Sequence, residues 1–329
     1  MSVAPGPRNL ISDVAGLRVG HATDERAQTG VTVLLPDRAW VAAVDVRGGG
    51  PGVRETDTLA PENLVPGVHA ITLSGGSVFG LAAADGVTAR LSTSGIGLQL
   101  APGGHVIPIV PGAVLHDLSG AGDKDWGETP PYRGLGMAAL DAATVDFALG
   151  SVGAGRGARA GTEKGGIGSA SLVLEDGLTV GALAAVNPVG SARMTPGGAF
   201  WAWPLEIGAE FGAIPPDPTC RAIEPVAEQT KLAALGRLSP GGNTTLVVVA
   251  TDADLTKGEA KRLAMMAQDG IARAIRPAHT PFDGDLVFAL ASGAVMLGES
   301  GARPARLARL GAAAADCVAR AIARGVHLA

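Results

Sequence analysis

The sequence predicts an α/β protein whose layers pack closely, and three observations support this fold class. Glycine accounts for 49 of the 329 residues and aromatic residues for only 3%, so small residues let helices and sheets approach one another. Short runs rich in β-branched residues alternate with segments whose apolar residues have helical spacing. The length is sufficient to bury a substantial core, in one large domain or two ordinary ones.

The composition also limits the classes of partner. The formal net charge is −5 and charged residues make up 17% of the chain, which argues against a general nucleic-acid binder or a binder of anionic membranes. The first residues lack the basic start and apolar core of a signal peptide, and no run approaches the roughly 18 apolar residues of a membrane helix. We therefore expect a cytoplasmic protein that acts on a small molecule or a peptide.

The two cysteines, Cys220 and Cys317, form neither a metal-binding CxxC pair nor the framework of a disulfide-rich domain. A single disulfide between them stays possible. We expect neither a metal nor a cofactor.

The N-terminal part is predicted to form short strands separated by turns. Residues 17–21 and 29–35 are β-rich runs, and residues 40–47 form another that enters the glycine cluster at 48–52. That cluster predicts either a tight turn or a loop that lines a pocket.

A strand, a glycine-rich turn and a helix are predicted at residues 68–73, 74–77 and 78–91. Such a turn can cradle an anion with its backbone N–H groups, but the lysine of a Walker motif is missing. We favour the interpretation that Gly75 and Gly76 allow the helix and the sheet to approach closely, and we keep both as candidates for the substrate pocket.

The middle of the chain is predicted to continue the sheet at residues 105–118, with prolines at edges or bends. Residues 120–133 are polar and rich in glycine and proline, which is typical of a surface loop. Residues 134–148 have helical spacing.

Residues 153–168 are rich in glycine and contain a GxGxxA match. A dinucleotide site needs a strand before this motif and a helix after it, and residues 162–166 are a poor helix start, so we do not favour nucleotide binding. Lys164 is surrounded by small residues. Its ammonium either steers charge in a pocket or belongs to a solvated loop.

Residues 169–174 and 178–186 predict a β-hairpin. Asn187 ends its second strand, where a side-chain amide can donate to a developing oxyanion or cap a turn. Residues 203–243 are rich in proline and turn residues, with one short helical stretch at 226–235. We interpret them as a long irregular arm.

The arm ends where a flexible PGGN lead-in meets the hydrophobic strand 244–250. Glycines permit strained backbone geometry there, and the β-branched run holds the backbone after it in an extended conformation. The hydroxyl of Thr244 could attack the carbonyl just before it and cut the chain, which would leave a threonine whose own α-amine serves as base. The alternative is an ordinary loop that enters a strand.

Two helices and a strand are predicted after this strand. Thr256 and Glu259 form a capping box at the start of a helix whose apolar stripe covers residues 260–274. A strand follows at 286–290, and an alanine-rich helix extends from about residue 304 to residue 324.

Asp283 and Asp285 flank a glycine at the entrance to the last predicted strand. Two carboxylates in this arrangement can bind a cation, orient an ammonium or form a turn. The further ligands of a calcium loop are missing, so a metal site is not favoured.

Several of these segments together resemble one family, the self-processing aminopeptidase/D-esterase-amidase hydrolases, which include β-peptidyl aminopeptidases and the nylon-oligomer hydrolase. The matching segments occur in the family's order and span nearly the whole chain. They are DVAGLRVGHAT (13–23), LSGGSVFGL (73–81), GGIG (165–168), NPVG (187–190), GNTTL (242–246), ATDA (250–253), and HT (279–280) with DGD (283–285).

The resemblance implies a four-layer αββα sandwich like that of the N-terminal nucleophile hydrolases. It also implies a single hydrolase domain, 1–329, which is made as a precursor and cuts itself into chains 1–243 and 244–329. The oxygen of Thr244 would attack the carbonyl of Asn243, and an N-to-O acyl shift and hydrolysis would follow. The released α-amine, with an unperturbed pKa of roughly 8, would then serve as base in forming an acyl-enzyme.

The resemblance also implies roles for other residues. Asn187 is similar to the family's asparagine on the oxyanion side, and Lys164 looks like a lysine found near the nucleophile in the nylon-oligomer branch. Asp283 and Asp285 match the acidic pair of that branch, which would orient the new ammonium. His116 stands where that branch has a tyrosine, so this part of the substrate pocket is expected to differ.

The implied substrates are short peptides or 6-aminohexanoate-type oligoamides. The Asn243–Thr244 bond favours the nylon-oligomer branch, because the aminopeptidase branch usually has Gly-Ser there; an aminopeptidase that releases N-terminal D-, L- or β-amino acids is the alternative. The resemblance further implies a homo-oligomer, commonly a tetramer of αβ units. Two other hypotheses are a non-catalytic small-ligand-binding protein built on the loops 74–77 and 153–161, and a pseudo-enzyme that never matures.

Overall fold

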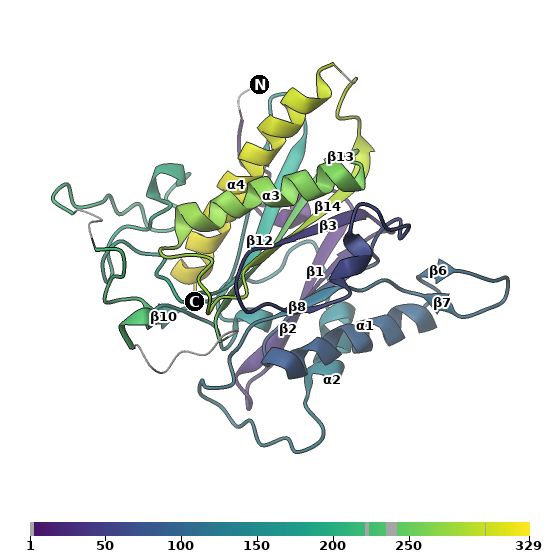
Figure 1. The fold of residues 1–329 in the computed structure, drawn as a ribbon, viewed down its shortest axis with the longest axis horizontal. Coiled ribbons are helices and arrows are strands. Elements are labelled where there is room, and N and C mark those ends of the chain that lie inside the picture. Colours follow the sequence, from purple (N-terminus) through teal and green to yellow (C-terminus); the bar gives the residue numbers. More distant parts are fainter. Residues whose placement is uncertain (1–2, 221–223, 235–241, 300) are drawn as a thin grey trace.

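Two five-stranded sheets lie face to face in the molecule, and a pair of helices covers the outer face of each sheet (Figure 1). The computed structural model describes residues 3–220, 224–234, 242–299 and 301–329. Among these residues, no helix is both long and apolar enough to cross a membrane.

The first sheet has the strand order β1-β2-β5-β8-β4. Its strands are β1 (Leu17–Asp24), β2 (Thr29–Pro36), β4 (Gly52–Arg54), β5 (Ile71–Ser74) and β8 (Gly112–Val114). The helices α1 (Ala82–Thr93) and α2 (Tyr132–Asp141) pack on its outer face through a cluster of buried aliphatic residues. The predicted strands near residues 17–35 and 68–73 and the helix near 78–91 are confirmed.

The second sheet has the order β11-β12-β13-β14-β3, so β13 is its central strand. Its strands are β3 (Val41–Val46), β11 (Ile167–Val173), β12 (Thr179–Asn187), β13 (Thr244–Ala253) and β14 (Leu286–Val295). The helices α3 (Lys257–Ala274) and α4 (Arg303–His327) cover it. The capping box of Thr256 and Glu259 starts α3 as predicted.

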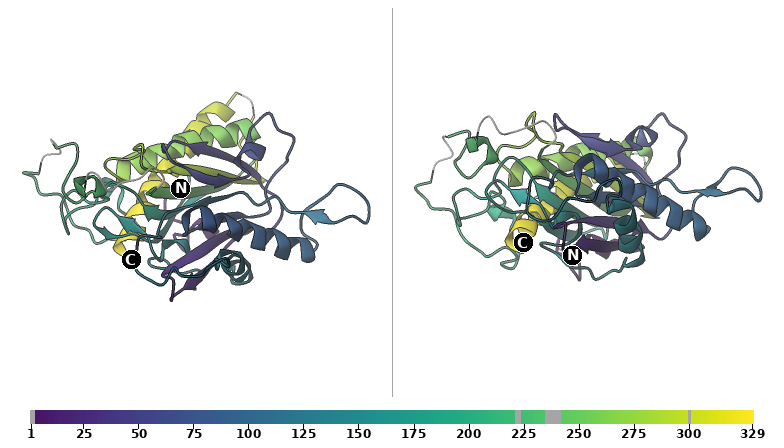
Figure 2. Two further views of the ribbon diagram at one scale, coloured as in Figure 1. Left: turned by 60° about the horizontal axis from the view of Figure 1, so that its bottom comes forward. Right: turned by 90° about the horizontal axis from the view of Figure 1, so that it is seen from below.

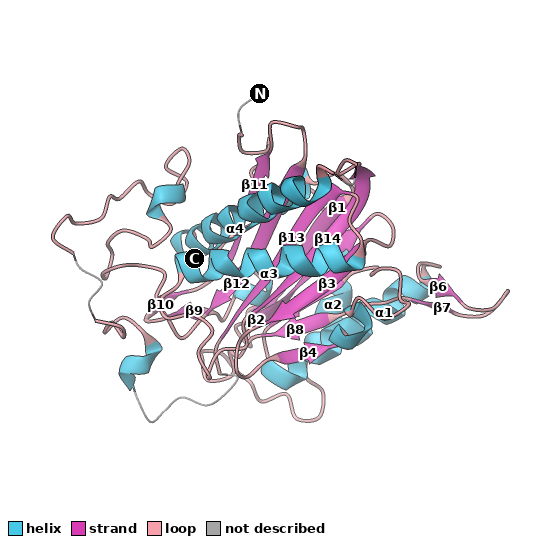
Figure 3. Cartoon of the chain, turned by 45° about the horizontal axis from the view of Figure 1, so that its top comes forward, coloured by secondary structure: helices cyan, strands magenta, loops and turns pink. Residues whose placement is uncertain are grey.

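Three clusters of buried apolar side chains hold this arrangement together, one between the two sheets and one between each sheet and its helices. Figure 3 shows the strands and the flanking helices of these layers. On β13, Val247 and Val249 face the α3–α4 layer, whereas Leu246, Val248 and Ala250 face the layer between the sheets. Because both faces of this strand are covered, its sequence is a continuous hydrophobic run. The predicted αββα sandwich is confirmed.

Small residues bring the layers close together, as the composition predicted. A Cβ atom on Gly168 of β11 would overlap the carbonyl oxygen of Ala321 on α4. Any larger residue would therefore push α4 away from the sheet that carries β12 and β13.

Some segments differ from the prediction. Helix α2 ends at Asp141 and not near residue 148, because Thr144 exchanges two backbone hydrogen bonds with Val19 at the edge of β1. Strand β7 (Val106–Ile107) pairs with β6 (Leu98–Gln99) in a hairpin that projects from the body (Figure 2). The first part of the segment predicted at 105–118 therefore does not continue the sheet, whereas β8 in its second part does.

The remaining elements are short. Strands β9 (Arg159–Ala160) and β10 (Glu163–Lys164) form a two-stranded ribbon. Six 3₁₀ helices are described, at Ile11–Asp13, Thr56–Leu59, Ser77–Leu81, Gly153–Gly155, Trp203–Leu205 and Lys231–Ala234. The 3₁₀ helix at Lys231–Ala234 falls within the helical stretch predicted at 226–235. Residue 235 of that stretch, and Pro240 and Gly241 of the predicted lead-in, lie outside the described residues.

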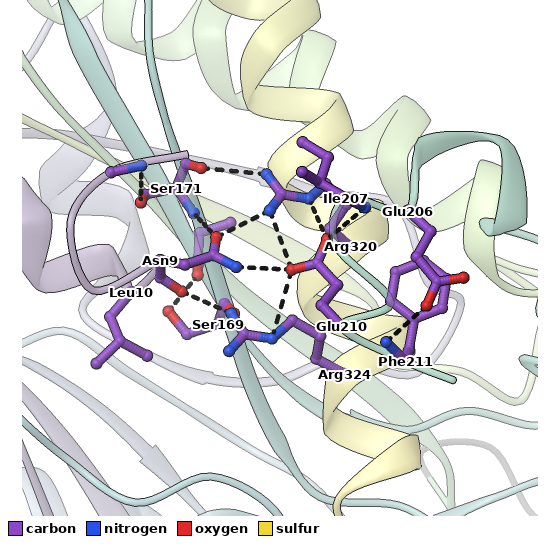
Figure 4. Close-up of polar contacts among 12 residues, drawn as sticks. Asn9, Leu10, Ser169, Ser171, Glu206, Ile207, Glu210, Phe211, Arg320 and Arg324 are labelled. Atoms are coloured by element: carbon purple, nitrogen blue, oxygen red, sulfur yellow. Dashed lines mark hydrogen bonds and ion pairs between the residues drawn. The ribbon is translucent and has the colours of Figure 1, made fainter. Parts of the chain in front are cut away.

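A buried ionic network fastens the start of the irregular arm to α4 (Figure 4). The guanidinium of Arg320 donates to Glu210 at 2.6 Å, to the side-chain oxygen of Asn9 at 2.9 Å and to the backbone oxygen of Ser171 at 3.1 Å. Arg324 lies on the other side of the Glu210 carboxylate, at 3.6 Å. The network therefore ties α4, β11 and the arm to one another.

Replacing Arg320 by Met should lower the free energy of unfolding by roughly 3–5 kcal/mol, because it removes the closest charged partner of the buried Glu210 carboxylate. The exposed pair of Arg90 and Asp141 offers a matched control, and Arg90→Met should cost about 0–1 kcal/mol. Urea denaturation of the three proteins measures both values. Equal losses in the two variants would contradict a stabilising role for the network.

Candidate active site

Strand pairing places the side chains of Thr244 and Asn187 next to each other. Asn187 ends β12, Thr244 begins β13, and the antiparallel register sets these two residues directly opposite one another. Residues paired in this way have Cβ atoms about 5 Å apart, on the same face of the sheet. Both are buried, and Thr244 is only 1% exposed.

The peptide bond before Thr244 lies between two hydrogen-bond donors. The hydroxyl of Thr244 donates to the carbonyl oxygen of Asn243, the residue that precedes it. The backbone N–H of Gly284 donates to the same oxygen at 2.8 Å. The hydroxyl is thus held against the carbonyl group of its own peptide bond, and an amide lies where negative charge on that oxygen would be stabilised.

Asp283 is fully buried beside this peptide bond. One of its carboxylate oxygens accepts the N–H of Val189 at 2.9 Å, and the other accepts the N–H and the hydroxyl of Thr280 at 3.0 and 2.6 Å. Burial, reinforced by the charge of Asp285, raises the pKa of Asp283 to about 6. Asp283 is therefore a poorly solvated carboxyl group that three hydrogen bonds hold in place.

Asp285 is also fully buried and holds the start of β13. One carboxylate oxygen accepts the N–H of Thr245 at 2.6 Å. The other accepts the backbone N–H and the Nδ1 atom of His279, each at 3.0 Å. Asp285 thus holds the start of β13, whereas the carboxylate of Asp283 anchors Val189 and Thr280 next to it. Neither residue is among those that line the adjacent cavity.

A cavity of about 1120 Å³ opens in front of Asn187 and Asn243. Its wall combines glycine-rich loops with polar and charged side chains, including Gly50, Val78, His116, Asp117, Arg159 and Lys231. The loop at 48–52 lines it, as one of the two predictions for that cluster stated. The volume suits a small ligand or a short peptide segment.

The side-chain amide of Asn187 has a fixed orientation at this wall. Its Oδ1 atom accepts the backbone N–H of Arg159 at 2.9 Å and the ammonium of Lys231 at 3.3 Å. Its Nδ2 atom donates to the carbonyl oxygen of His116 at 3.1 Å. Because the oxygen faces two donors, the NH₂ group is the end that can donate to a ligand.

The structure does not bring Lys164 to this site. Its side chain is exposed on β10, where it pairs with Arg159 across the ribbon, and it is not among the cavity residues. The ammonium beside Asn187 is that of Lys231, whose pKa burial lowers to about 7. Sequence analysis missed Lys231, because only the folding of the arm against β12 brings it there.

His116, Gly75 and Gly76 were all predicted to line the substrate pocket, and the structure places them differently. His116 lines the cavity, and burial lowers the pKa of its imidazole. Gly75 and Gly76 lie behind the wall instead: the N–H of Gly76 donates to Asp117 at 2.8 Å, and a Cβ atom on Gly75 would overlap that carboxylate. The expectation that they line the pocket is corrected, and the interpretation as close-packing glycines agrees with the structure.

Asp117 is a second residue that sequence analysis did not single out. It is buried at the cavity wall, where Thr29 donates to it at 2.5 Å, and burial raises its pKa. Since Asp117 already takes the N–H of Gly76, and the N–H of Gly75 donates to Gly30 at 2.9 Å, these two amides are not free to cradle an anion.

Comparisons with known proteins identify the family of this chain. The model of peptidase family S58 matches residues 9–329. An uncharacterized aminopeptidase of Mycobacterium tuberculosis is 46% identical over 334 residues, which cover 97% of this chain and 93% of that protein. A 6-aminohexanoate-oligomer endohydrolase of Kocuria sp. is 32% identical over 292 residues, covering 87% of this chain and 75% of that protein.

The fold has a solved counterpart in the L-aminopeptidase D-Ala-esterase/amidase of Ochrobactrum anthropi, described as a variant of the Ntn hydrolase fold. That structure aligns with a TM-score of 0.66 and 22% sequence identity, over 99% of this chain and 87% of that one. The chain therefore belongs to peptidase family S58 and is an amide-bond hydrolase.

Proposed function

We propose that this hydrolase processes itself: Thr244 first cuts the chain after Asn243 and then acts as an N-terminal nucleophile on amide bonds of short peptides or 6-aminohexanoate-type oligoamides. One observation carries the proposal. The hydroxyl of Thr244 is hydrogen-bonded to the carbonyl group of Asn243, and that carbonyl already has an N–H donor from Gly284.

Self-cleavage needs no group from outside the chain except water. The Thr244 oxygen attacks the carbonyl carbon of Asn243, the C–N bond breaks, and the nitrogen takes up the proton that the hydroxyl loses. This N-to-O shift leaves an ester. Water then hydrolyses the ester and releases the carboxylate of Asn243 and the free amine of Thr244.

The cut would also open the site. Thr244 is buried in the intact chain, and Asn243, directly before it, contributes to the cavity wall. Once the segment that ends at Asn243 is a free C-terminus, it can move and expose the nucleophile to the cavity. Activity on external substrates should therefore depend on cleavage.

In turnover, the same oxygen attacks the substrate carbonyl, and the free α-amine accepts its proton and returns it to the leaving amine. The resulting acyl-enzyme is hydrolysed by water. Asn187 donates from Nδ2 to the oxyanion, whereas Asp283 and Asp285 hold the new ammonium end of the strand in place. A role for Lys164 has no support from its exposed position.

The names of the relatives are consistent with two modes of cleavage. One relative is named as an aminopeptidase and another as an endohydrolase of 6-aminohexanoate oligomers. Assays with amino-acyl amides and with N-capped 6-aminohexanoate oligomers separate the two. Release only from free amino ends identifies an aminopeptidase, internal cuts in capped oligomers identify an endo-amidase, and no hydrolysis of either class contradicts the proposal.

Gly284→Ala should slow self-cleavage by about 100-fold, because small displacements of reacting groups have effects of this size. A Cβ atom there would lie 2.7 Å from the Thr244 hydroxyl oxygen and 2.9 Å from the carbonyl oxygen of Gly50. Gly258→Ala, in helix α3 with nothing within 4 Å of the added carbon, is the matched control. Electrophoresis after pulse expression measures the rate, and unchanged cleavage in Gly284→Ala would refute the assigned geometry.

A further inference from the structure

The ammonium of Lys231 contacts two neutral oxygen atoms of a single residue. It lies 3.3 Å from Oδ1 and 3.5 Å from the backbone oxygen of Asn187. Among the described residues, no carboxylate lies within ion-pair distance of it. A partly buried cation of this kind stabilises the negative end of the dipole that it faces.

That dipole is the side-chain amide of Asn187. Its oxygen and nitrogen have nearly the same shape, so a half-turn of the amide exchanges them at little steric cost. With Lys231 protonated, the exchanged orientation would set N–H groups against an ammonium and against the backbone N–H of Arg159. Lys231 therefore favours the orientation in which Nδ2 is available to a ligand in the cavity.

We propose that Lys231 is a positioning residue for substrate hydrolysis: its ammonium holds Oδ1 of Asn187, so that Nδ2 faces the carbonyl oxygen of the bound substrate. The inference rests on the proposed function. It concerns turnover and not self-cleavage, because the carbonyl of Asn243 takes its N–H donor from Gly284. Loss of Lys231 should thus separate the two activities.

The charges around Lys231 come from several elements. Asp283, before β14, favours the ammonium, whereas Arg159 on β9 disfavours it. His116, after β8, also interacts with Lys231: burial, with a further contribution from the ammonium, lowers the pKa of its imidazole. Glu228 precedes it on its own segment and also lines the cavity. The net result, dominated by burial, is a pKa of about 7 for Lys231. The ammonium is present below this pH and is lost above it, so its help to Asn187 should fade as the pH rises past 7.

The experiment uses the mature protein and the variants Lys231→Met, Lys231→Arg, Asn187→Ala and the double variant Asn187→Ala/Lys231→Met. Lys257→Met is the control, because Lys257 also donates to two carbonyl oxygens, those of Thr58 and Asn63, on another part of the surface. Electrophoresis measures self-cleavage, and steady-state assays on amino-acyl amides and 6-aminohexanoate oligomers measure kcat and KM.

Lys231→Met should be cut like the wild type, which also reports its folding, but lose about 10- to 100-fold in kcat, the usual effect of removing an orienting partner. The arginine variant should recover most of the activity and lose less of it between pH 7 and 9. In the Asn187→Ala background, Lys231→Met should have no further effect.

The inference would be overturned by additive losses in the double variant, by a loss of self-cleavage as large as the loss of turnover, or by a cut and active Lys231→Met enzyme with normal kcat. Failure of the proposed function appears differently, as a wild-type chain that stays uncut or a Thr244→Ala variant with full activity. A larger loss in Lys164→Met than in Lys231→Met would also overturn the inference, and would favour the role that the family resemblance gives to Lys164.

Discussion

Thr244→Ala should yield a single uncut chain that does not hydrolyse amides. In the proposed mechanism, the change removes the oxygen that attacks the carbonyl of Asn243 and, in turnover, the substrate carbonyl. Loss of a catalytic nucleophile lowers kcat by on the order of 10⁶-fold. Denaturing electrophoresis and amide hydrolysis assays on the purified variant measure the two effects.

Thr245→Val is the matched control, since the neighbouring threonine is equally buried. Its hydroxyl has no hydrogen-bond partner among the described residues, so replacing it by a methyl group of similar size should leave cleavage and activity intact. If instead Thr245→Val stays uncut and Thr244→Ala is processed, the nucleophile is Thr245. If neither variant differs from an uncut and inactive wild type, the protein is a pseudo-enzyme.

Asn187→Ala should lower kcat by about 10²- to 10³-fold, roughly 2.7–4 kcal/mol in activation free energy, because one donor to the oxyanion is lost. Self-cleavage should continue, since Gly284 and not Asn187 donates to the carbonyl oxygen of Asn243. Asn63→Ala is the control, an exposed asparagine that donates to the backbone of Asp57. A block of self-cleavage in Asn187→Ala would contradict this division of roles.

Local rules were sufficient for much of the fold. The capping box of Thr256 and Glu259 starts α3, and the β-branched run from Thr244 forms β13. These signals depend on neighbours in sequence, which is why single-sequence patterns identify them. The sandwich itself came from the family resemblance, because patterns of this kind do not determine which strands pair.

The predicted residues that the structure brings together at the site had local signals in the sequence, and the resemblance assigned roles to them. Pairing of β12 with β13 brings Asn187 to Thr244, and the loop before β14 adds Asp283 and Asp285. Lys231 had no local signal: its position depends on a long-range contact between the arm and the end of β12. Burial lowers the pKa of its ammonium, and the neighbouring residues in the sequence do not reveal that Lys231 is buried.

Gly75 and Gly76 have a local signal for a binding site that the tertiary structure does not support. Their place between a strand and a helix is typical of an anion-binding turn. In the structure the buried carboxylate of Asp117, more than forty positions along the chain, takes the N–H of Gly76 and fills the space beside Gly75. Only tertiary structure shows that this turn already has its partner.

The most direct test of self-processing by Thr244 is N-terminal sequencing of the smaller fragment of the purified wild-type protein, together with its intact mass. We predict a fragment of residues 244–329 whose first residues are Thr-Thr-Leu-Val. A fragment that begins at Thr245 or elsewhere would contradict the assignment of the nucleophile. A single chain of 32.7 kDa that hydrolyses amides without being cut would contradict the account as a whole.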